Sequence, residues 1–337
     1  MAPSRPYTTE HTLTVDAPPH DLYALVADVG RWPAVFEPCV HVHHLERGEH
    51  AERFELWAQV GGGVSHWTSR RELDPRALRV TFAQEVSRAP IASMRGEWRF
   101  VERPGGRTQV VLLHWFTAVE EDAGAVRWIS EALDRNSAAE LTALGAVASG
   151  GCPVGEVLFS FTDIQRIPGP ARAAYAFVHR ADRWAELLPH VAGVELTETP
   201  DGVQDLRMET VTADGAKHFT ASTRVCRDGA WIAYKQRVLP RLLLGHSGLW
   251  TFTDEADAAG AGGGSVATAT HTVRLDPGAV ESVLGTGRTL TDARAYLRDV
   301  LGRNSTATLS HAARYAAARG ADTGSPPPGG PGAHPAA

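Results

Sequence analysis

The sequence is poor in cysteine, in basic runs and in long apolar segments, and each shortage excludes a class of protein. Its three cysteines stand far apart without C-x-x-C spacing, which predicts no disulfide framework and a reducing, cytoplasmic location. No stretch approaches about 18 consecutive apolar residues, and residues 1–14 lack an apolar core, so neither a membrane span nor a signal peptide is expected. With a net charge of −6 and no basic run, nucleic acid and anionic membrane are not expected partners.

Motifs of covalent, metal and nucleotide enzymes are missing as well. No G-x-S-x-G nucleophile elbow occurs, and the glycines at 262–264 lack the Lys-Ser/Thr of a phosphate-binding loop, which favours a hairpin loop there. His41 and His43 could share a strand face as metal ligands, but no third ligand is near in sequence, and the second half has Gly193 and Glu195 at these places. We therefore expect exposed strand histidines, no metal and no cofactor.

What the chain does contain is a long internal repeat. Several short patterns return in the same order about 150 residues further along, which is the length of a globular domain and far longer than a solenoid repeat. We predict two copies of one domain, at 1–150 and 151–319, before a disordered Gly/Pro/Ala-rich tail at 320–337. The paired patterns are Tyr23-x-x-Val26 with Tyr175-x-x-Val178, Gly96-x-Trp98 with Gly248-x-Trp250, and Arg135-Asn136-Ser137 with Arg303-Asn304-Ser305.

Both copies show one order of expected elements. A short alternating strand (11–15 and 157–161) precedes a helix, led in the first copy by Pro18 and Pro19, and six further strands and a long helix come after it. In the first copy the strands are expected at 39–46, 52–60, 64–73, 77–86, 92–101 and 107–119, and the closing helix at 123–147; the second copy closes with a helix at 284–318. A curved antiparallel sheet this long cannot cover its own concave face, so the closing helix must cover it. The fold class is therefore α+β, with a ligand cavity between sheet and helix.

Alternation along the strands decides which side chains face that cavity, since successive residues of a strand point to opposite faces. Trp57 falls on the outer face, which makes it a candidate contact between domains or subunits. Both faces of the strand around residue 112 are apolar, so alternation does not orient His114. The inward-facing set is Phe54, Trp67, Ser69, Arg71, Met94 and Trp98.

Arg71 is the most informative member of this set. A guanidinium inside an apolar cavity is costly unless it is paired, and it cannot lose its proton. One interpretation is a salt bridge to a carboxylate at the strand end; the other is an arginine aimed at ligand oxygens. Ser69 could share that oxygen or simply fill a strand position, and the surrounding aromatic side chains could be plain core or the walls of a flat ligand's pocket.

The order of elements resembles the helix-grip fold of the START and birch-allergen-like superfamily. More narrowly, the chain resembles the aromatase/cyclases of bacterial type II polyketide synthases, and its tandem form is similar to two-domain members that act on ketoreduced chains. The resemblance covers both halves, roughly residues 8–318. It is carried by Trp32-Pro33-x-x-Phe36, Trp67-x-Ser69-x-Arg71, Met94-x-x-x-Trp98 and Asn136-Ser137.

The resemblance implies an enzyme without cofactor that folds a poly-β-ketone chain carried by acyl carrier protein and works beside other polyketide synthase subunits. It would close the first ring by aldol condensation between carbons 7 and 12 and then dehydrate it. Arg71 would polarise the attacked carbonyl with help from Ser69, and His114 is the candidate for proton transfer. Exposed Arg70, Arg95 and Arg99 are possible carrier-protein contacts. The implied walls are Trp32, Phe36, Phe54, Trp67, Met94 and Trp98, with Trp184 and Trp250 in the second half.

The second half keeps the polar pair Ser222 and Arg224 as further catalytic candidates but loses part of the aromatic wall. His246 stands where the first half has Met94, and the position at which the family often carries an aromatic hydroxyl is Cys39 here. We therefore expect the first pocket to carry the chemistry, while two pockets working in turn is the alternative. Because no dedicated nucleophile or base is evident, a non-catalytic START-like carrier of an aromatic or lipid ligand also stays open.

Overall fold

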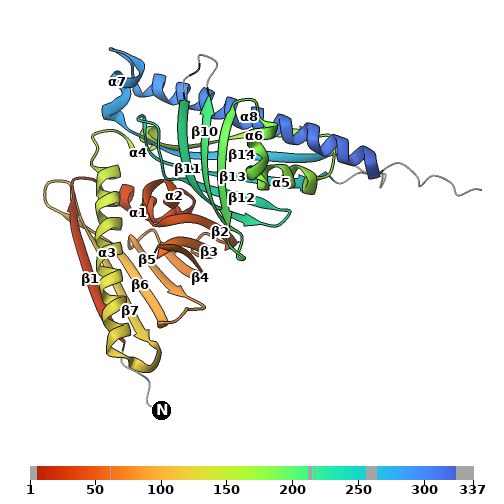
Figure 1. Ribbon diagram of the computed structural model, residues 1–337. Coiled ribbons are helices and arrows are strands. Elements are labelled where there is room, and N and C mark those ends of the chain that lie inside the picture. Colours follow the sequence, from red (N-terminus) through yellow and green to blue (C-terminus); the bar gives the residue numbers. More distant parts are fainter. Residues whose placement is uncertain (1–5, 61, 212–214, 216, 256–263, 324–337) are drawn as a thin grey trace, which may run out of the picture.

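Two antiparallel sheets of seven strands each dominate the computed structural model, which describes residues 6–60, 62–211, 215, 217–255 and 264–323. The first sheet has the order β1-β7-β6-β5-β4-β3-β2, so consecutive strands form a meander and the first strand returns beside the last. The second sheet repeats this order as β8-β14-β13-β12-β11-β10-β9. A long helix lies along each sheet, α3 on the first and α8 on the second (Figure 1). The expected α+β helix-grip arrangement is therefore confirmed.

The first domain contains all the strands that the sequence predicts, with ends that differ by a few residues. The strand expected at 11–15 begins earlier, at Tyr7, because Tyr7 pairs with Phe116 at the far end of a long β7. Gly145 of α3 lets this helix approach β1, since a Cβ there would lie 3.1 Å from Leu13 Cδ2. The elements are β1 (Tyr7–Val15), α1 (Pro19–Ala27), η1 (Val29–Arg31), α2 (Trp32–Val35), β2 (Cys39–Arg47), β3 (Ala51–Val60), β4 (Gly63–Asp74), β5 (Arg79–Gln84), β6 (Ile91–Arg103), β7 (Arg107–Ala118), η2 (Val119–Glu121) and α3 (Ala123–Ala148).

The second domain has the same order, and its closing helix differs from the prediction. The helix expected at 284–318 begins later, at Leu290, because Gly285 and Gly287 take positive φ values of 107° and 79° after the short helix α7, which ends at Leu284. The elements are α4 (Val154–Val157), β8 (Leu158–Ile167), α5 (Ala171–His179), η3 (Ala181–Arg183), α6 (Trp184–Leu187), β9 (Val191–Glu198), β10 (Val203–Val211), β11 (Lys217–Arg227), β12 (Trp231–Gln236), β13 (Leu243–Asp254), β14 (Ser265–Leu275), η4 (Pro277–Ala279), α7 (Val280–Leu284) and α8 (Leu290–Thr323).

Two predicted segments fall partly or wholly outside the described residues. Helix α8 continues to Thr323, so the first residues of the expected tail at 320–337 are helical, and residues 324–337 lie outside the described part of the chain. The hairpin loop expected at 262–264 lies outside it except for Gly264. The domain boundary at 150–151 stays a prediction; it falls between the end of α3 and the start of α4. Among the described helices, none is long and apolar enough to cross a membrane.

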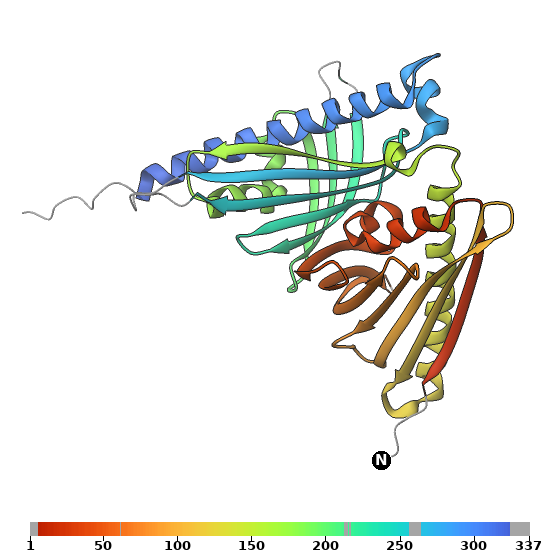
Figure 2. The ribbon, with the colours of Figure 1, turned by 180° about the vertical axis from the view of Figure 1, so that it is seen from behind.

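The two domains meet where β2 and β3 of the first face β11 and β12 of the second, and α2 lies against β13 (Figures 1 and 2). An apolar cluster at this contact contains Trp57 and Trp231, whose ring centroids are 5.7 Å apart. The outward orientation predicted for Trp57, as a contact between domains, is confirmed. His41 is buried here, 8% exposed, with its ring 4.8 Å from that of Trp231. The expectation of exposed strand histidines was therefore wrong for His41, because the second domain covers this strand.

Candidate active site

A cavity of about 270 Å³ lies in the first domain, between the concave face of the sheet and α3. Strands β3 to β7 contribute inward-facing side chains, α2 closes one end, and α3 forms the roof. The site residues that the sequence predicts for the first half all line this cavity, and His114, which alternation could not orient, faces it too. They are Trp32, Phe36, Phe54, Trp67, Ser69, Arg71, Met94, Trp98 and His114.

The wall at the α2 end is aromatic and held in a fixed orientation. The ring of Trp32 meets those of Phe36 and Phe54 edge to face, with centroids 5.4 Å and 6.4 Å away. The indole N–H of Trp32 donates to the carbonyl oxygen of Val26 at 3.2 Å, which fixes the ring against the end of α1. Edge-to-face aromatic pairs and a satisfied N–H make such a wall rigid, and a rigid wall can hold a flat ligand in one orientation.

Arg71 is buried at the base of this wall, 1% exposed, and each of its three nitrogen atoms has a protein acceptor. Its Nε donates to Glu52 Oε1 at 2.8 Å, and its two Nη atoms donate to the carbonyl oxygens of Val26 and Ala27 at 2.8 Å and 2.7 Å. Glu52 stands directly opposite Arg71 in the β3–β4 register. The pairing with a carboxylate, one of the two interpretations of the sequence, is thus present. Since most of its N–H groups are engaged, Arg71 has little donor capacity left for a ligand.

Glu52 completes this buried ion pair through a third residue. His44 Nε2 lies 3.1 Å from Glu52 Oε2. Burial raises the pKa of Glu52, but its hydrogen bonds to His44 and Arg71 outweigh burial and hold the pKa below its ordinary value. The pKa of Arg71 is lowered by burial, which the charge and hydrogen bond of Glu52 oppose. The guanidinium also lies 5.1 Å from the Trp32 ring centroid, so the ion pair supports the aromatic wall.

His114 and Ser137 each bring to the cavity a buried polar atom for which the described residues offer no partner. Neither Nδ1 of His114 nor Oγ of Ser137 on α3 has a hydrogen-bond partner among the described residues. Burial, and secondarily the charge of His11, lowers the pKa of His114 to about 4, so the imidazole is neutral near pH 7. A neutral imidazole has one donor and one acceptor nitrogen, and a buried polar atom without a partner is costly. Both atoms can therefore form a hydrogen bond with a ligand oxygen or a water in the cavity.

Glu140 is a site residue that the sequence interpretation missed. It lies on α3, lines the cavity, and burial raises the pKa of its carboxyl group to about 7. A carboxyl group with such a pKa is present in both protonation states near neutral pH and can act as an acid or a base. The signal was available, because Glu140 is four residues after Asn136 and therefore shares its helix face. Arg88, exposed in the β5–β6 connection, also lines the cavity and brings a cation to it.

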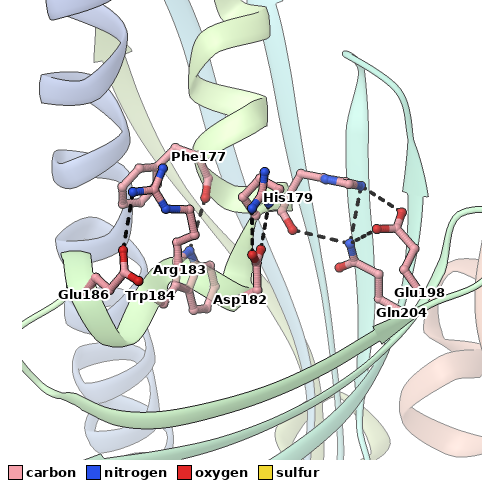
Figure 3. Close-up of polar contacts among 9 residues, drawn as sticks. Phe177, His179, Asp182, Arg183, Trp184, Glu186, Glu198 and Gln204 are labelled. Carbon is pink, nitrogen blue, oxygen red and sulfur yellow. Dashed lines mark hydrogen bonds and ion pairs between the residues drawn. The ribbon is translucent and has the colours of Figure 1, made fainter.

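The second domain places Arg224 in the same way but with different neighbours. It is 3% exposed, donates through Nη2 to the carbonyl oxygen of Val178 at 2.7 Å, and lies 5.7 Å from the Trp184 ring centroid. Gln204 stands opposite it in the β10–β11 register, where Glu52 stands opposite Arg71 in the first domain. Figure 3 shows the Gln204 amide directed to Glu198 and His179 instead, with its Nε2 3.0 Å from Glu198 Oε2. Arg224 therefore has no carboxylate across the strand.

The remaining predicted residues of the second half are also buried, and four inward positions there hydrogen-bond to one another. Ser222 and Trp250 are 6% and 8% exposed. Tyr234 Oη and His246 Nε2 lie 3.1 Å and 3.0 Å from His271 Nδ1, and His271 Nε2 lies 2.5 Å from Ser305 Oγ on α8. Burial lowers the pKa of His246 to about 3 and that of His271 to about 4, so both rings are neutral.

The same four positions in the first domain are Phe82, Met94, His114 and Ser137, which line the cavity. Register supports the correspondence, since His114 pairs with Gly96 and His271 with Gly248. The histidine and serine that bond to each other in the second domain thus stand unpartnered, among the described residues, in the first. The two interiors differ in chemistry although their backbones share one plan.

The sequence matches the family described as "Polyketide cyclase / dehydrase and lipid transport" twice, over residues 15–142 and 167–287. It is 57% identical over 311 residues to the granaticin polyketide synthase bifunctional cyclase/dehydratase of Streptomyces violaceoruber, covering 92% of this chain and 94% of that protein. It is 52% identical over 325 residues to the actinorhodin polyketide synthase bifunctional cyclase/dehydratase of Streptomyces coelicolor, covering 93% and 98%.

Solved structures give the same result for the fold. The di-domain ARO/CYC BexL from the BE-7585A biosynthetic pathway superimposes with a TM-score of 0.79 at 44% identity, covering 92% of this chain and 98% of that one. The di-domain ARO/CYC StfQ from the steffimycin biosynthetic pathway gives a TM-score of 0.78 at 34% identity, covering 92% and 99%. Both matches extend over both domains of the present chain.

Proposed function

Since this chain belongs to the polyketide cyclase/dehydrase family and is a cyclase/dehydratase of the type II polyketide synthase kind, we propose that its first domain closes and aromatises one ring of a ketoreduced poly-β-ketone chain. The chain would be delivered by acyl carrier protein, and the ring would form between carbons 7 and 12. The observation that carries the proposal is the aromatic-walled cavity, in which polar atoms of His114 and Ser137 have no partner within the described part of the chain.

The proposed reaction begins with an aldol condensation. A methylene between two ketones loses a proton, its carbon attacks a ketone carbon of the same chain, and the resulting alkoxide takes up a proton to give a tertiary alcohol. Neutral His114 is the candidate to remove the first proton, because its Nδ1 has no partner among the described residues and accepts a proton in the Nε2–H tautomer. The aromatic wall holds the chain bent, and this positioning contributes an effective concentration that can lower the barrier by several kcal/mol.

Dehydration is the second step. The carbon next to the new alcohol loses a proton, its hydroxyl leaves as water, and the new double bond is conjugated with the ring ketone. Loss of a second water, from the hydroxyl that ketoreduction left in the ring, and enolisation of the ring ketone then complete the aromatic ring. Leaving of hydroxide needs an acid, and Glu140, with a pKa of about 7, is our candidate for it. We assign Arg71 and Ser69 to the attacked carbonyl, where Arg71 contributes positive potential rather than several free hydrogen bonds, because Glu52 and α1 already use its donors.

Carrier protein would approach near the cavity, and its acidic surface calls for cations on this domain. Arg88 meets this requirement at the cavity, and Arg70, Arg95 and Arg99 are exposed on the outer face of the same sheet. The hydrogen bond from Arg99 to Glu97 reduces its availability, so Arg88 and Arg95 are the better candidates. The other polyketide synthase subunits complete the proposed set of partners.

Reconstitution with a minimal polyketide synthase and a ketoreductase tests the proposal. Adding this protein should replace spontaneously cyclised products by one aromatised product, and His114→Gln should remove that effect while leaving the circular dichroism spectrum unchanged. An unaltered product pattern in the presence of the folded wild-type protein would contradict the enzymatic function and leave a carrier of aromatic or lipid ligands as the better account.

A further inference from the structure

One side chain of the second domain reaches the wall of the first domain's cavity. Lys235 Nζ, on β12, lies 2.7 Å from the carbonyl oxygen of Phe36, 2.6 Å from that of Glu37 and 2.9 Å from that of Cys39. An ammonium group has three N–H donors, and here each has an acceptor in one short turn of the other domain. Phe36 and Cys39, which present these carbonyls, also line the cavity.

The turn that Lys235 holds presents three carbonyl oxygens to it. It comes directly after the four-residue helix α2, and the oxygens of Phe36, Glu37 and Cys39 all lie beyond the last residue of that helix, Val35. The contacts with Phe36 and Cys39 are part-buried and that with Glu37 is exposed, so loss of the ammonium would cost most at the first two carbonyls. The side chains of Phe36, Pro38 and Cys39 point to the cavity while the lysine binds the backbone from behind.

Strand β12 gives the lysine a firm base because its two faces belong to two different environments. Trp231 and Ala233 pack in the cluster between the domains, and Lys235 is the next residue on that face. Tyr234 points the opposite way, into the second domain, where it bonds to His271. The position of the ammonium is thus fixed by packing on one side and by a buried hydrogen bond on the other.

Further contacts near Lys235 hold the two domains in this relative position. Gly245 of β13 lets its backbone approach α2, since a Cβ there would lie 2.0 Å from the carbonyl oxygen of Ala34. Gln59, which lines the cavity, donates through Nε2 to Thr223 Oγ1 at 3.3 Å. Such close backbone contact fixes the distance between Lys235 and the turn, so the lysine cannot move away without displacing α2.

We propose that Lys235 is a positioning residue for the first domain's site: its ammonium fixes the turn at residues 36–39, and the second domain thereby sets the shape of the cavity in which the ring closes. The part of this inference that concerns ring closure rests on the proposed function. The contact between Lys235 and the turn is independent of that function. Lys235 touches no substrate and acts through Phe36 and Cys39. The duplicated domain then has a role in the reaction even where its own interior takes no part in it.

The chain offers a matched control, because Lys217 and Lys235 are its two lysines. Lys217 lies on β11 of the same domain, exposed, with its Nζ 2.6 Å from Glu209. Burial lowers the pKa of Lys235 to about 8, against the opposing influence of Cys39 and Glu37, whereas the hydrogen bond to Glu209 raises the pKa of Lys217. Because the pKa values of the two lysines lie on opposite sides of the ordinary lysine pKa, their signals can be separated in a titration of the full-length, lysine-labelled protein by nuclear magnetic resonance.

The experiment combines that titration with the reconstituted synthase. Lys235→Met should lower the ratio of aromatised product to spontaneous by-products by tenfold or more, while Lys217→Met leaves the ratio at the wild-type value. Lys235→Arg, which keeps the charge but presents a planar fork to three convergent carbonyls, should restore the ratio only in part. Melting curves of the variants verify that the compared proteins are folded.

Two results would overturn the inference. One is a wild-type product ratio from folded Lys235→Met. The other is a Lys235 signal in the wild-type protein with the same chemical shift and titration as the signal of exposed Lys217, which would show that the ammonium is not enclosed at the domain contact. If Lys235→Met does not fold, the titration of the wild-type protein still tests the inference. If the wild-type protein leaves the synthase products unchanged, the proposed function fails, and the titration still tests the contact.

Discussion

The main effect of removing Arg71 should be a loss of stability of the first domain. The side chains of Arg71 and Glu52 are 1% and 4% exposed, and Arg71 also binds two carbonyl groups at the end of α1. Arg71→Ala would leave a buried carboxylate with only His44 beside it and two carbonyl oxygens without their donor. Breaking a buried ion pair by removing one partner costs about 3–5 kcal/mol. At about 2–4 °C per kcal/mol for a domain of this size, the melting temperature should fall by about 6–20 °C.

The control lies on the same strand. Arg70 is exposed on the opposite face, so Arg70→Ala should change stability by no more than about 0.5 kcal/mol. Calorimetry of the first-domain transition, combined with the turnover of whatever fraction is folded, separates the structural from the catalytic contribution. A melting temperature of Arg71→Ala within about 2 °C of the wild type would refute the reasoning, because a guanidinium that can be removed at that cost is not holding Glu52 and α1.

Glu52→Gln extends the test, because it introduces the residue that the second domain has at the corresponding position. There Gln204 stands opposite Arg224 at the corresponding register. The amide keeps an acceptor for Arg71 but removes the neutralising charge, so we expect a smaller loss of stability than for Arg71→Ala. If positive potential at Arg71 assists the attacked carbonyl, ring closure per folded molecule should be kept or raised in Glu52→Gln and lost in Arg71→Ala. Equal activity in the two variants would remove the electrostatic role from Arg71.

Four further outcomes are expected. His114→Gln should lower ring closure by about a hundredfold or more without a change in the melting temperature, as measured in the reconstituted synthase. If Glu140 acts as the acid, wild-type turnover should fall as the pH rises through about 7, where Glu140 loses its proton, and Glu140→Gln should abolish that dependence. His246 and His271 have folded pKa values of about 3 and 4, below the unfolded value near 6.5, so the unfolded chain binds more protons in between. The contribution of these two histidines to the free energy of unfolding is complete above about pH 6.5 and is lost on acidification, by about 2 kcal/mol each at pH 5. The free energy of unfolding in urea should therefore depend less on pH in His246→Gln than in the wild type. Arg224→Ala should impair ring closure less than Arg71→Ala per folded molecule, and an equal loss would contradict a single active pocket.

Local periodicity in the sequence was enough to orient the strand side chains of the site, except for His114, whose strand is apolar on both faces. Strand alternation put Trp67, Ser69 and Arg71 on the cavity face and Trp57 on the outer face, because a period of two leaves one choice once the solvent face is recognised. The internal repeat then carried the same assignment to the second half. The start of the closing helix in that half was an exception, because α8 begins at Leu290 and not at 284, after the positive φ values of Gly285 and Gly287.

Partners that lie far apart in the sequence were beyond the reach of such patterns. Glu52 is opposite Arg71 only because of the β3–β4 register, which alternation does not specify, and Lys235 meets Phe36 only because the two domains dock. His41 was misjudged for the same reason, since a strand that is exposed in one domain can be covered by another. Periodicity gives the face of a side chain, whereas its partner depends on packing between elements.

Duplication explains why one interior could change its chemistry while the fold was kept. A histidine and a serine at corresponding places face a cavity in the first domain and bond to each other in the second, where Tyr234 and His246 replace the apolar Phe82 and Met94. A buried network satisfies its polar groups internally and strengthens the packing of β12. That strand carries Lys235 to the first domain's wall. If Lys235 positions the cavity wall as proposed, the polar interior of the second domain acts on the cavity of the first through β12, and a substitution inside the network, such as Tyr234→Phe, should alter ring closure through the position of Lys235.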